Sequence, residues 1–242
     1  MVVSRTARGT CFRLDRGRPL KVPPVPVDPD RVTRLEVILT GSPRTGTSFL
    51  ASLVHDMTGL PMGERLKPAD ERNVHGYFEL LPLMRLEDEL LGLLGGDFAN
   101  PPAVPERWPD ALAEPRRRMQ AIVDEHGARL YKGNRAMILA DLYDELFPDA
   151  RWIRIDRDVE ATHRSRWGAP LSIDAWREIS EARTRAWRRT RPSRRAHEVR
   201  YEDFELAPER AVEDLAAFLE LEWTPDDTRA ALARWKPRRV AG

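Results

Sequence analysis

The segment Leu39–Leu50, LTGSPRTGTSFL, has the glycine spacing of a phosphate-binding loop. Gly41, Gly46 and Ser48 occupy the positions of the motif G-x-x-x-x-G-K-[ST], but Thr47 stands where that motif has its lysine. In ATP-type loops the lysine reaches the β- and γ-phosphates, and the hydroxyl that follows it holds Mg²⁺. The sequence therefore predicts an anion-binding loop whose anion differs from a nucleoside triphosphate.

The cation of this loop comes earlier, at Arg44, and hydroxyl groups accompany it at Thr45, Thr47 and Ser48. A guanidinium binds a terminal oxyanion group through two parallel hydrogen bonds. A donor that reacts without a metal needs no hydroxyl to hold Mg²⁺. These residues favour a two-unit anion that is shorter than a triphosphate.

Two elements must position this loop. The apolar run RLEVILTG (34–41) predicts a buried parallel strand before it. A helix is expected to begin at about Thr47 and to end at Gly59. At the start of such a helix the backbone N–H groups and the helix dipole attract anions, so the unit as a whole predicts an anion site.

Further strands and helices alternate along the chain. Strands are expected in ARLYKG (128–133), RWIRIDR (151–157) and HEVRYEDF (197–204). Helices are expected at 81–96, 114–127, 136–150, 158–167, about 172–190, and 208–221. This alternation predicts a three-layer α/β/α fold, in which a central parallel sheet is covered on both faces and the ligand lies at the carboxyl ends of the strands.

Composition limits the remaining possibilities. We expect an extended, proline-rich arm at 1–34 and a single α/β domain at 35–242. The 40 basic and 39 acidic residues leave a net charge of +1, which argues against a general nucleic-acid binder. An apolar run of membrane-spanning length and a signal-peptide core are both missing, and Cys11 is the single cysteine. We therefore expect a cytoplasmic protein.

Three motifs, in this order, resemble the sulfotransferases that use 3′-phosphoadenosine 5′-phosphosulfate (PAPS). The loop of that family reads P-[KR]-[ST]-G-[ST]-[ST], and Pro43–Ser48 reads PRTGTS. The second motif is an arginine that ends a middle strand and a serine eight residues later, matched by Arg157 and Ser165; Val159 replaces the proline that usually follows. The third motif is matched by VRYEDF and PERAVEDLAAFLELEW within 199–223.

The resemblance implies a P-loop nucleoside-triphosphate-hydrolase-like fold. It implies transfer of a sulfuryl group from PAPS to a hydroxyl or amine of a small-molecule, sugar or lipid acceptor, with adenosine 3′,5′-bisphosphate (PAP) as the second product and no metal required. The residues that it assigns to the 5′-phosphosulfate are Arg44, Thr45, Gly46, Thr47 and Ser48. It assigns Arg157 and Ser165 to the 3′-phosphate.

Catalysis of this transfer requires stabilisation of charge on the moving group and on the leaving oxygen. We expect Arg44 to stabilise that charge. Lys132, at the end of the second predicted strand, is placed to reach the same sulfate. Arg135, three residues later, is a weaker candidate for the same role.

The base that takes the proton of the acceptor is the remaining role. The segment ERNVHGYFE (71–79) resembles the N-x-x-G-Y-[FW]-E segment of bacterial family members, and Glu79 closes it. Glu79 is the first candidate, because a half-buried apolar setting would raise its pKa. Glu64 and His75 are the alternatives.

Two other functions stay open from the sequence. A divergent P-loop kinase would need an acidic metal ligand, for which Asp156 is the nearest match. A non-catalytic nucleotide-binding or interaction protein of the same fold is the second alternative. The arginine-rich run Arg183–Arg195 predicts a solvated helix face or a guide for anionic ligands. The acceptor and the oligomeric state are not encoded in any recognisable pattern.

Overall fold

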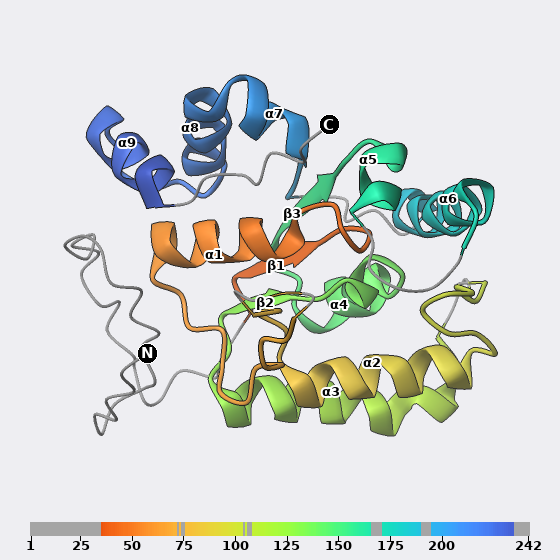
Figure 1. Cartoon of the computed structure of the whole chain (residues 1–242). Helices are drawn as coiled ribbons and strands as arrows, with labels where there is room; N and C mark the ends of the chain where they lie inside the picture. The colour runs from red at the N-terminus through yellow and green to blue at the C-terminus, as the bar shows by residue number, and fades with distance from the viewer. Residues whose placement is uncertain are drawn as a thin grey trace.

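The fold is that of a computed structural model, which describes residues 35–71, 73, 76–103, 105, 108–165, 171–189 and 195–234. The arm expected at 1–34 lies outside this part of the chain. The strands are β1 (Val37–Thr40), β2 (Leu130–Lys132), β3 (Arg151–Asp156) and β4 (Ala196–Arg200). In the described residues they form one parallel sheet in the order β2-β1-β3-β4 (Figure 1).

Helices connect and cover these strands. The longer ones are α1 (Thr47–Thr58), α2 (Leu81–Leu93), α3 (Ala113–His126), α6 (Ile173–Arg189), α8 (Pro208–Phe218) and α9 (Pro225–Arg234). The shorter ones are α4 (Ala140–Leu146), α5 (Val159–Arg164), α7 (Tyr201–Leu206) and the 3₁₀ turns η1 (Asp110–Leu112) and η2 (Arg135–Met137). Glycines in the left-handed conformation end α1 and α3, as the sequence predicts.

Side chains of the sheet alternate between two hydrophobic cores, because successive residues of a strand point to opposite faces. Ile38 and Trp152 belong to the core under α2, α3, α4 and α6. Leu39 and Ile153 belong to the core under α1, α7, α8 and α9. Figure 1 shows α1, α8 and α9 on one side of the sheet and α2, α3 and α4 on the other. The predicted three-layer α/β/α, P-loop-like architecture is confirmed.

The strand order brings the predicted site segments to one edge of the sheet. All four strands run in the same direction, so their carboxyl ends lie together. The strand β1 lies between β2 and β3, with Leu39 opposite Lys132 on one side and Thr40 opposite Arg154 on the other. The loop after β1 is therefore flanked by the ends of β2 and β3, which is where open parallel sheets bind ligands.

One predicted strand is shorter than expected. The segment HEVRYEDF leaves the sheet after Arg200, and α7 begins at Tyr201. The backbone N–H of Arg200 donates to Asp203 Oδ2 at 2.9 Å, which closes a capping box at the start of the helix. Tyr201 and Phe204, one helical turn apart, are both buried. Local capping therefore overrides the β propensity of the aromatic residues.

The helix expected at 136–150 is also divided. The turn η2 comes first, Leu139 leaves ideal helical geometry, and α4 follows. Ala136 to Ala140 are all completely buried. A regular amphipathic helix buries one face, so packing on every side of this segment accounts for the interruption.

Candidate functional site

The loop after β1 is held in its conformation by close packing of its glycines. A Cβ atom on Gly41 would lie 2.4 Å from the carbonyl oxygen of Ile155 on β3. A Cβ atom on Gly46, whose φ is 98°, would lie 2.4 Å from the ring of Tyr201. Arg44 also has a positive φ of 69°, and the hydroxyl of Thr45 donates to the Ser42 carbonyl at 2.7 Å. Both glycines are required by contacts with other elements.

The start of α1 is shaped to receive an anion. Gly46 is the N-cap residue and provides no side chain to bond the first-turn N–H groups. These N–H groups have no carbonyl partner within the helix. Thr47 and Ser48 are the first helical residues, with Thr47 buried and Ser48 half-buried. The first-turn backbone amides and the positive end of the helix dipole therefore lie together at the start of α1, where Thr47 and Ser48 also lie.

The arginine–serine pair at the end of β3 lies beside this loop. Arg44 Nε donates to the backbone carbonyl of Ser165 at 2.9 Å, across 121 residues of sequence. Arg157 places its guanidinium over the ring of Tyr201, with 4.1 Å from Cζ to the ring centroid. The same ring packs closely against Gly46, so Tyr201 lies between Arg157 and the loop. The structure thus brings together the two motifs that the sequence analysis assigned to one ligand.

The helix between Arg157 and Ser165 is capped at its start by Asp158. Asp158 Oδ1 accepts a hydrogen bond from the Ala161 N–H at 2.8 Å at the start of α5. Ser165 follows the last helical residue, and its hydroxyl donates to the Thr162 carbonyl at 2.9 Å. Arg157 and Ser165 are both half-buried, so a ligand at this edge can contact them.

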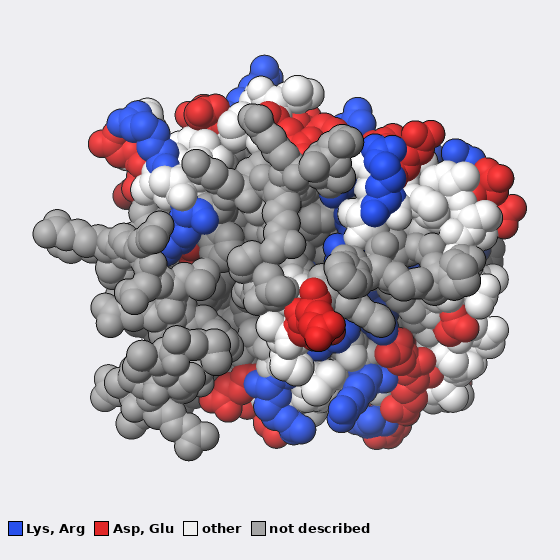
Figure 2. Space-filling view, viewed as in Figure 1, with Lys and Arg blue, Asp and Glu red and all other residues white. Residues whose placement is uncertain are grey.

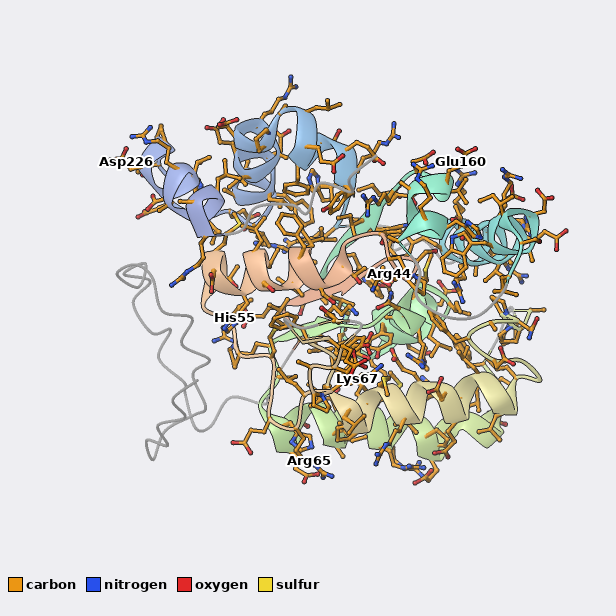
Figure 3. All side chains as sticks on the ribbon, viewed as in Figure 1. Arg44, His55, Arg65, Lys67, Glu160 and Asp226 are labelled. Carbon is orange, nitrogen blue, oxygen red and sulfur yellow. The ribbon has the colours of Figure 1, made fainter. Side chains whose placement is uncertain are left out.

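Lys132 and Glu79 form a buried ion pair next to the loop. Lys132 Nζ donates to Glu79 Oε1 at 2.7 Å, and the two residues are 2 % and 5 % exposed. Lys67 Nζ lies 3.9 Å from Glu79 Oε2. In Figure 3 Lys67 lies among the side chains between the sheet and α2, whereas Arg65 lies at the outer surface. Two ammonium groups therefore face one carboxylate.

The protonation state of Glu79 differs from the prediction. Burial raises the pKa of Glu79, but the attraction and hydrogen bond of Lys132, with help from Lys67 and Arg135, outweigh it and hold the pKa below its usual value. Burial lowers the pKa of Lys132 in spite of its contact with Glu79. The expectation that an apolar setting raises the pKa of Glu79 is wrong for this arrangement, because Lys132 was not expected as its partner.

Two asparagines that the sequence analysis did not single out contact this loop. Asn134 Nδ2 donates to the Gly41 carbonyl at 3.0 Å, and its Oδ1 atom is buried without a hydrogen-bond partner. Asn73 Nδ2 donates to Ser48 Oγ at 3.0 Å. Asn134 directly follows the segment ARLYKG, which was considered for Lys132. Asn73 lies in the segment ERNVHGYFE, which was considered for Glu79. The unpartnered Asn134 oxygen is an acceptor available to a ligand N–H or O–H group.

The other candidates are less favourably placed. Glu64 is exposed, and His75 lies outside the described residues. Arg135 forms an ion pair with Asp88 of α2. Asp156, the acidic residue that a kinase would need, pairs with Arg154 at 2.9 Å. Among the residues that the structure describes, no group of three or more His, Cys, Asp or Glu side chains is placed to hold a metal ion.

Comparison with known proteins identifies the family. The profile of the Sulfotransferase family matches residues 36–225. None of the curated proteins compared with the chain matches it. The region that the structure describes contains no helix with the length and hydrophobicity of a membrane span.

Several solved structures are similar to this chain, and the first one named here shows the same fold. Sulfotransferase STF9 from Mycobacterium avium is 17% identical, with a TM-score of 0.51, over 88% of this chain and 71% of that one. The sulfotransferase domain of the Synechococcus PCC 7002 olefin synthase is 18% identical, with a TM-score of 0.48, over 87% and 80% of the two chains. A mouse sulfotransferase complexed with PAP is 12% identical, with a TM-score of 0.45, over 82% and 64%.

Proposed function

The chain belongs to the sulfotransferase family, and from this premise we propose that it transfers a sulfuryl group from PAPS to a hydroxyl or amine of a small-molecule, sugar or lipid acceptor. The observation that carries the proposal is the contact between Arg44 and Ser165, because it joins the phosphosulfate loop to the 3′-phosphate pair at one edge of the sheet. A donor with anionic groups at both ends fits two such cationic sites.

The donor end of the site is formed by the loop and α1. In the proposal, Arg44, the hydroxyls of Thr47 and Ser48 and the first-turn N–H groups bind the 5′-phosphosulfate, and Thr45 and Gly46 hold the loop in shape. Arg157 and Ser165 bind the 3′-phosphate. None of these contacts needs a metal, because guanidinium and backbone N–H groups provide the positive charge.

Lys132 and Glu79 are proposed as the catalytic pair. Lys132 lies at the end of β2, next to the end of β1, and in the proposal its ammonium stabilises charge on the moving sulfuryl group. When Lys132 turns to that group, Glu79 loses its strongest partner, and burial then raises its pKa. A carboxylate in this state accepts the proton of the acceptor hydroxyl, as a general base requires. Donor binding and base activation are thereby coupled through one ion pair.

Titration calorimetry with PAP and with Mg²⁺·ATP tests the donor. We expect PAP to bind in EDTA and to bind more tightly than ATP. A preference for Mg²⁺·ATP would favour the kinase alternative, and binding of neither nucleotide would favour a non-catalytic role. The cytoplasmic location stays a prediction that this experiment does not address.

Transfer from labelled PAPS tests the catalytic pair, once an acceptor screen has provided a substrate. We expect Glu79→Gln to bind PAP with affinity similar to the wild type and to lose turnover by about a hundredfold or more, the usual contribution of a general base. The exposed Glu71 of the same segment, changed to Gln, is the matched control. Near-normal turnover of Glu79→Gln would remove Glu79 from the mechanism.

A further inference from the structure

The arginine-rich helix α6 carries one arginine that is not on its solvated face. The sequence predicts a solvated basic run from Arg183 onward, yet Arg183 is 3 % exposed, whereas the side chain of Arg185 is 68 % exposed. Trp176 and Trp187 of the same helix are also buried. Arg183 therefore occupies a position that an amphipathic helix gives to an apolar residue.

The contacts of Arg183 leave part of its guanidinium unused. Nε and Nη2 donate to the backbone carbonyl of Phe98, with 3.1 Å from Nε to the oxygen. The guanidinium also lies over the Phe98 ring, 4.0 Å from its centroid. Nη1 is buried and has no hydrogen-bond partner. An arginine guanidinium has five N–H donors whose planar arrangement matches carboxylate, sulfate and phosphate groups. In Arg183 the Nη1 donors are unused.

The charge of Arg183 is not neutralised by a contacting carboxylate in the described parts of the chain. Burial and the repulsion of Arg135 lower the pKa of Arg183 to about 10. The negative charge of Asp97 opposes this shift, but Asp97 forms no hydrogen bond with Arg183. The Asp97 carboxylate already accepts from the N–H groups of Ala99 and Asn100. A buried cation without an ion-pair partner is strongly unfavourable, and a bound anion would relieve it.

A second guanidinium lies at the same ring. Arg135 is 4.8 Å from the Phe98 ring centroid and pairs with Asp88. Its positive charge contributes to the lowered pKa of Glu79, so Arg135 lies near the proposed catalytic pair. In Figure 1 the loop after α2, which carries Phe98, lies against α6. Figure 2 shows basic and acidic side chains interspersed on the described part of the face in view.

We propose that Arg183 and Arg135 form a subsite for a negatively charged group of the acceptor, a carboxylate, sulfate or phosphate. The inference rests on the proposed function, because it names the substrate class of that site. The Phe98 ring and carbonyl cover the guanidinium of Arg183, and displacement of this loop frees Nη1 together with Nε and Nη2 for an oxyanion. Gly95, with φ 80°, ends α2 just before this loop, and its neighbour Gly96 donates to the Leu91 carbonyl at 3.0 Å.

Calorimetry with the donor site saturated by PAP tests the subsite. The probes are pairs that differ only in charge, such as 4-hydroxybenzoate and 4-hydroxybenzamide, and a longer pair of ω-hydroxy fatty acid and its amide. We expect the anionic member of at least one pair to bind more tightly than its amide. Arg183→Gln should abolish that preference, which corresponds to about a tenfold loss of anion affinity, and Arg185→Gln should keep it.

Each other outcome counts against the proposal. Equal binding of the charged and neutral members, or no binding of any anionic probe to the PAP complex, overturns the subsite. The proposal is also overturned if Arg183→Gln lowers the melting temperature but keeps the preference for the anionic probe. Arg183 would then only hold the Phe98 loop in place. Arg183→Lys keeps the charge without the fork and should retain part of the preference. If PAP itself fails to bind the wild type, the proposed function fails first.

Discussion

Replacement of Lys132 by methionine should destabilise the protein in a way that depends on pH. The change removes the ammonium from a pair whose members are 2 % and 5 % exposed and whose atoms are 2.7 Å apart. Glu79 then stays buried without its main partner. Loss of one member of a buried pair lowers the free energy of unfolding by about 3–5 kcal/mol. Lys67, 3.9 Å from Glu79, remains, so we expect the lower end of this range at pH 7.5.

The direction of the pH effect follows from the pKa of Glu79. In the wild type that pKa lies below the usual 4.5, so the stabilisation is present above about pH 5 and is lost only as the pH falls through the folded value. In Lys132→Met, burial is no longer opposed by Lys132 and raises the pKa above 4.5. The folded variant then binds a proton more readily than the unfolded chain does. Its deficit relative to the wild type should therefore shrink from pH 7.5 to pH 5.5.

Urea unfolding followed by tryptophan fluorescence measures this deficit, because Trp152 and Trp187 are buried in one core. The double variant Lys132→Met/Glu79→Gln removes both charges and should recover about 1 kcal/mol or more of the single deficit. Arg118→Met breaks an exposed pair and should change stability little. A deficit that is equal at both pH values, together with additive single and double variants, would refute the view that Lys132 neutralises a buried Glu79.

Three further predictions use other parts of the molecule. Arg157→Ala should weaken PAP binding by about tenfold to a hundredfold in calorimetry, whereas Arg164→Ala on the exposed side of α5 should not; equal effects would contradict the assignment. Gly46→Ala forces a Cβ atom into the ring that opens α7 and should lower stability by about 2 kcal/mol or more in urea unfolding, against about 1 kcal/mol for Gly127→Ala, which meets open space. Burial raises the pKa of Glu87 to about 7, so wild-type stability should fall by about 3 kcal/mol as the pH rises from 4.5 to above 7; Glu87→Gln should flatten that fall in a series of melting temperatures, and an unchanged slope would contradict it.

Much of the fold was predictable because its signals are local. Short apolar runs bounded by glycine or charge marked the strands, and the left-handed glycines ended the helices as expected. The prediction failed at Tyr201, where a capping box starts a helix, and after Ala136, where complete burial interrupts one. Both failures arise where local hydrogen bonds or surrounding packing override the preference of the residues themselves.

The candidate site also has parts that follow from local sequence and parts that depend on distant contacts. The loop from Gly41 to Ser48 is a continuous segment, so its spacing alone predicts an anion site, and the structure confirms the strand before it and the helix after it. The contacts of Asn134 and Lys132 join residues that are 93 and 53 positions apart, and no periodicity in one sequence encodes them. The burial of Arg183 is of the same kind, because its surroundings come from the loop after α2, 85 residues earlier.

The cations of the site are already bonded within the protein, and this shapes what donor binding must do. Arg44 donates to the Ser165 carbonyl and Lys132 to the Glu79 carboxylate. A donor therefore exchanges existing contacts for new ones, so its affinity reflects only the difference between them. Arg44 gives up a hydrogen bond to a neutral carbonyl, and breaking this bond costs little free energy. For Lys132 it is a buried carboxylate, whose pKa rises when the lysine leaves. In the proposed mechanism, part of the energy of donor binding would therefore go into a stronger base beside the acceptor, which would raise turnover at the expense of ground-state affinity.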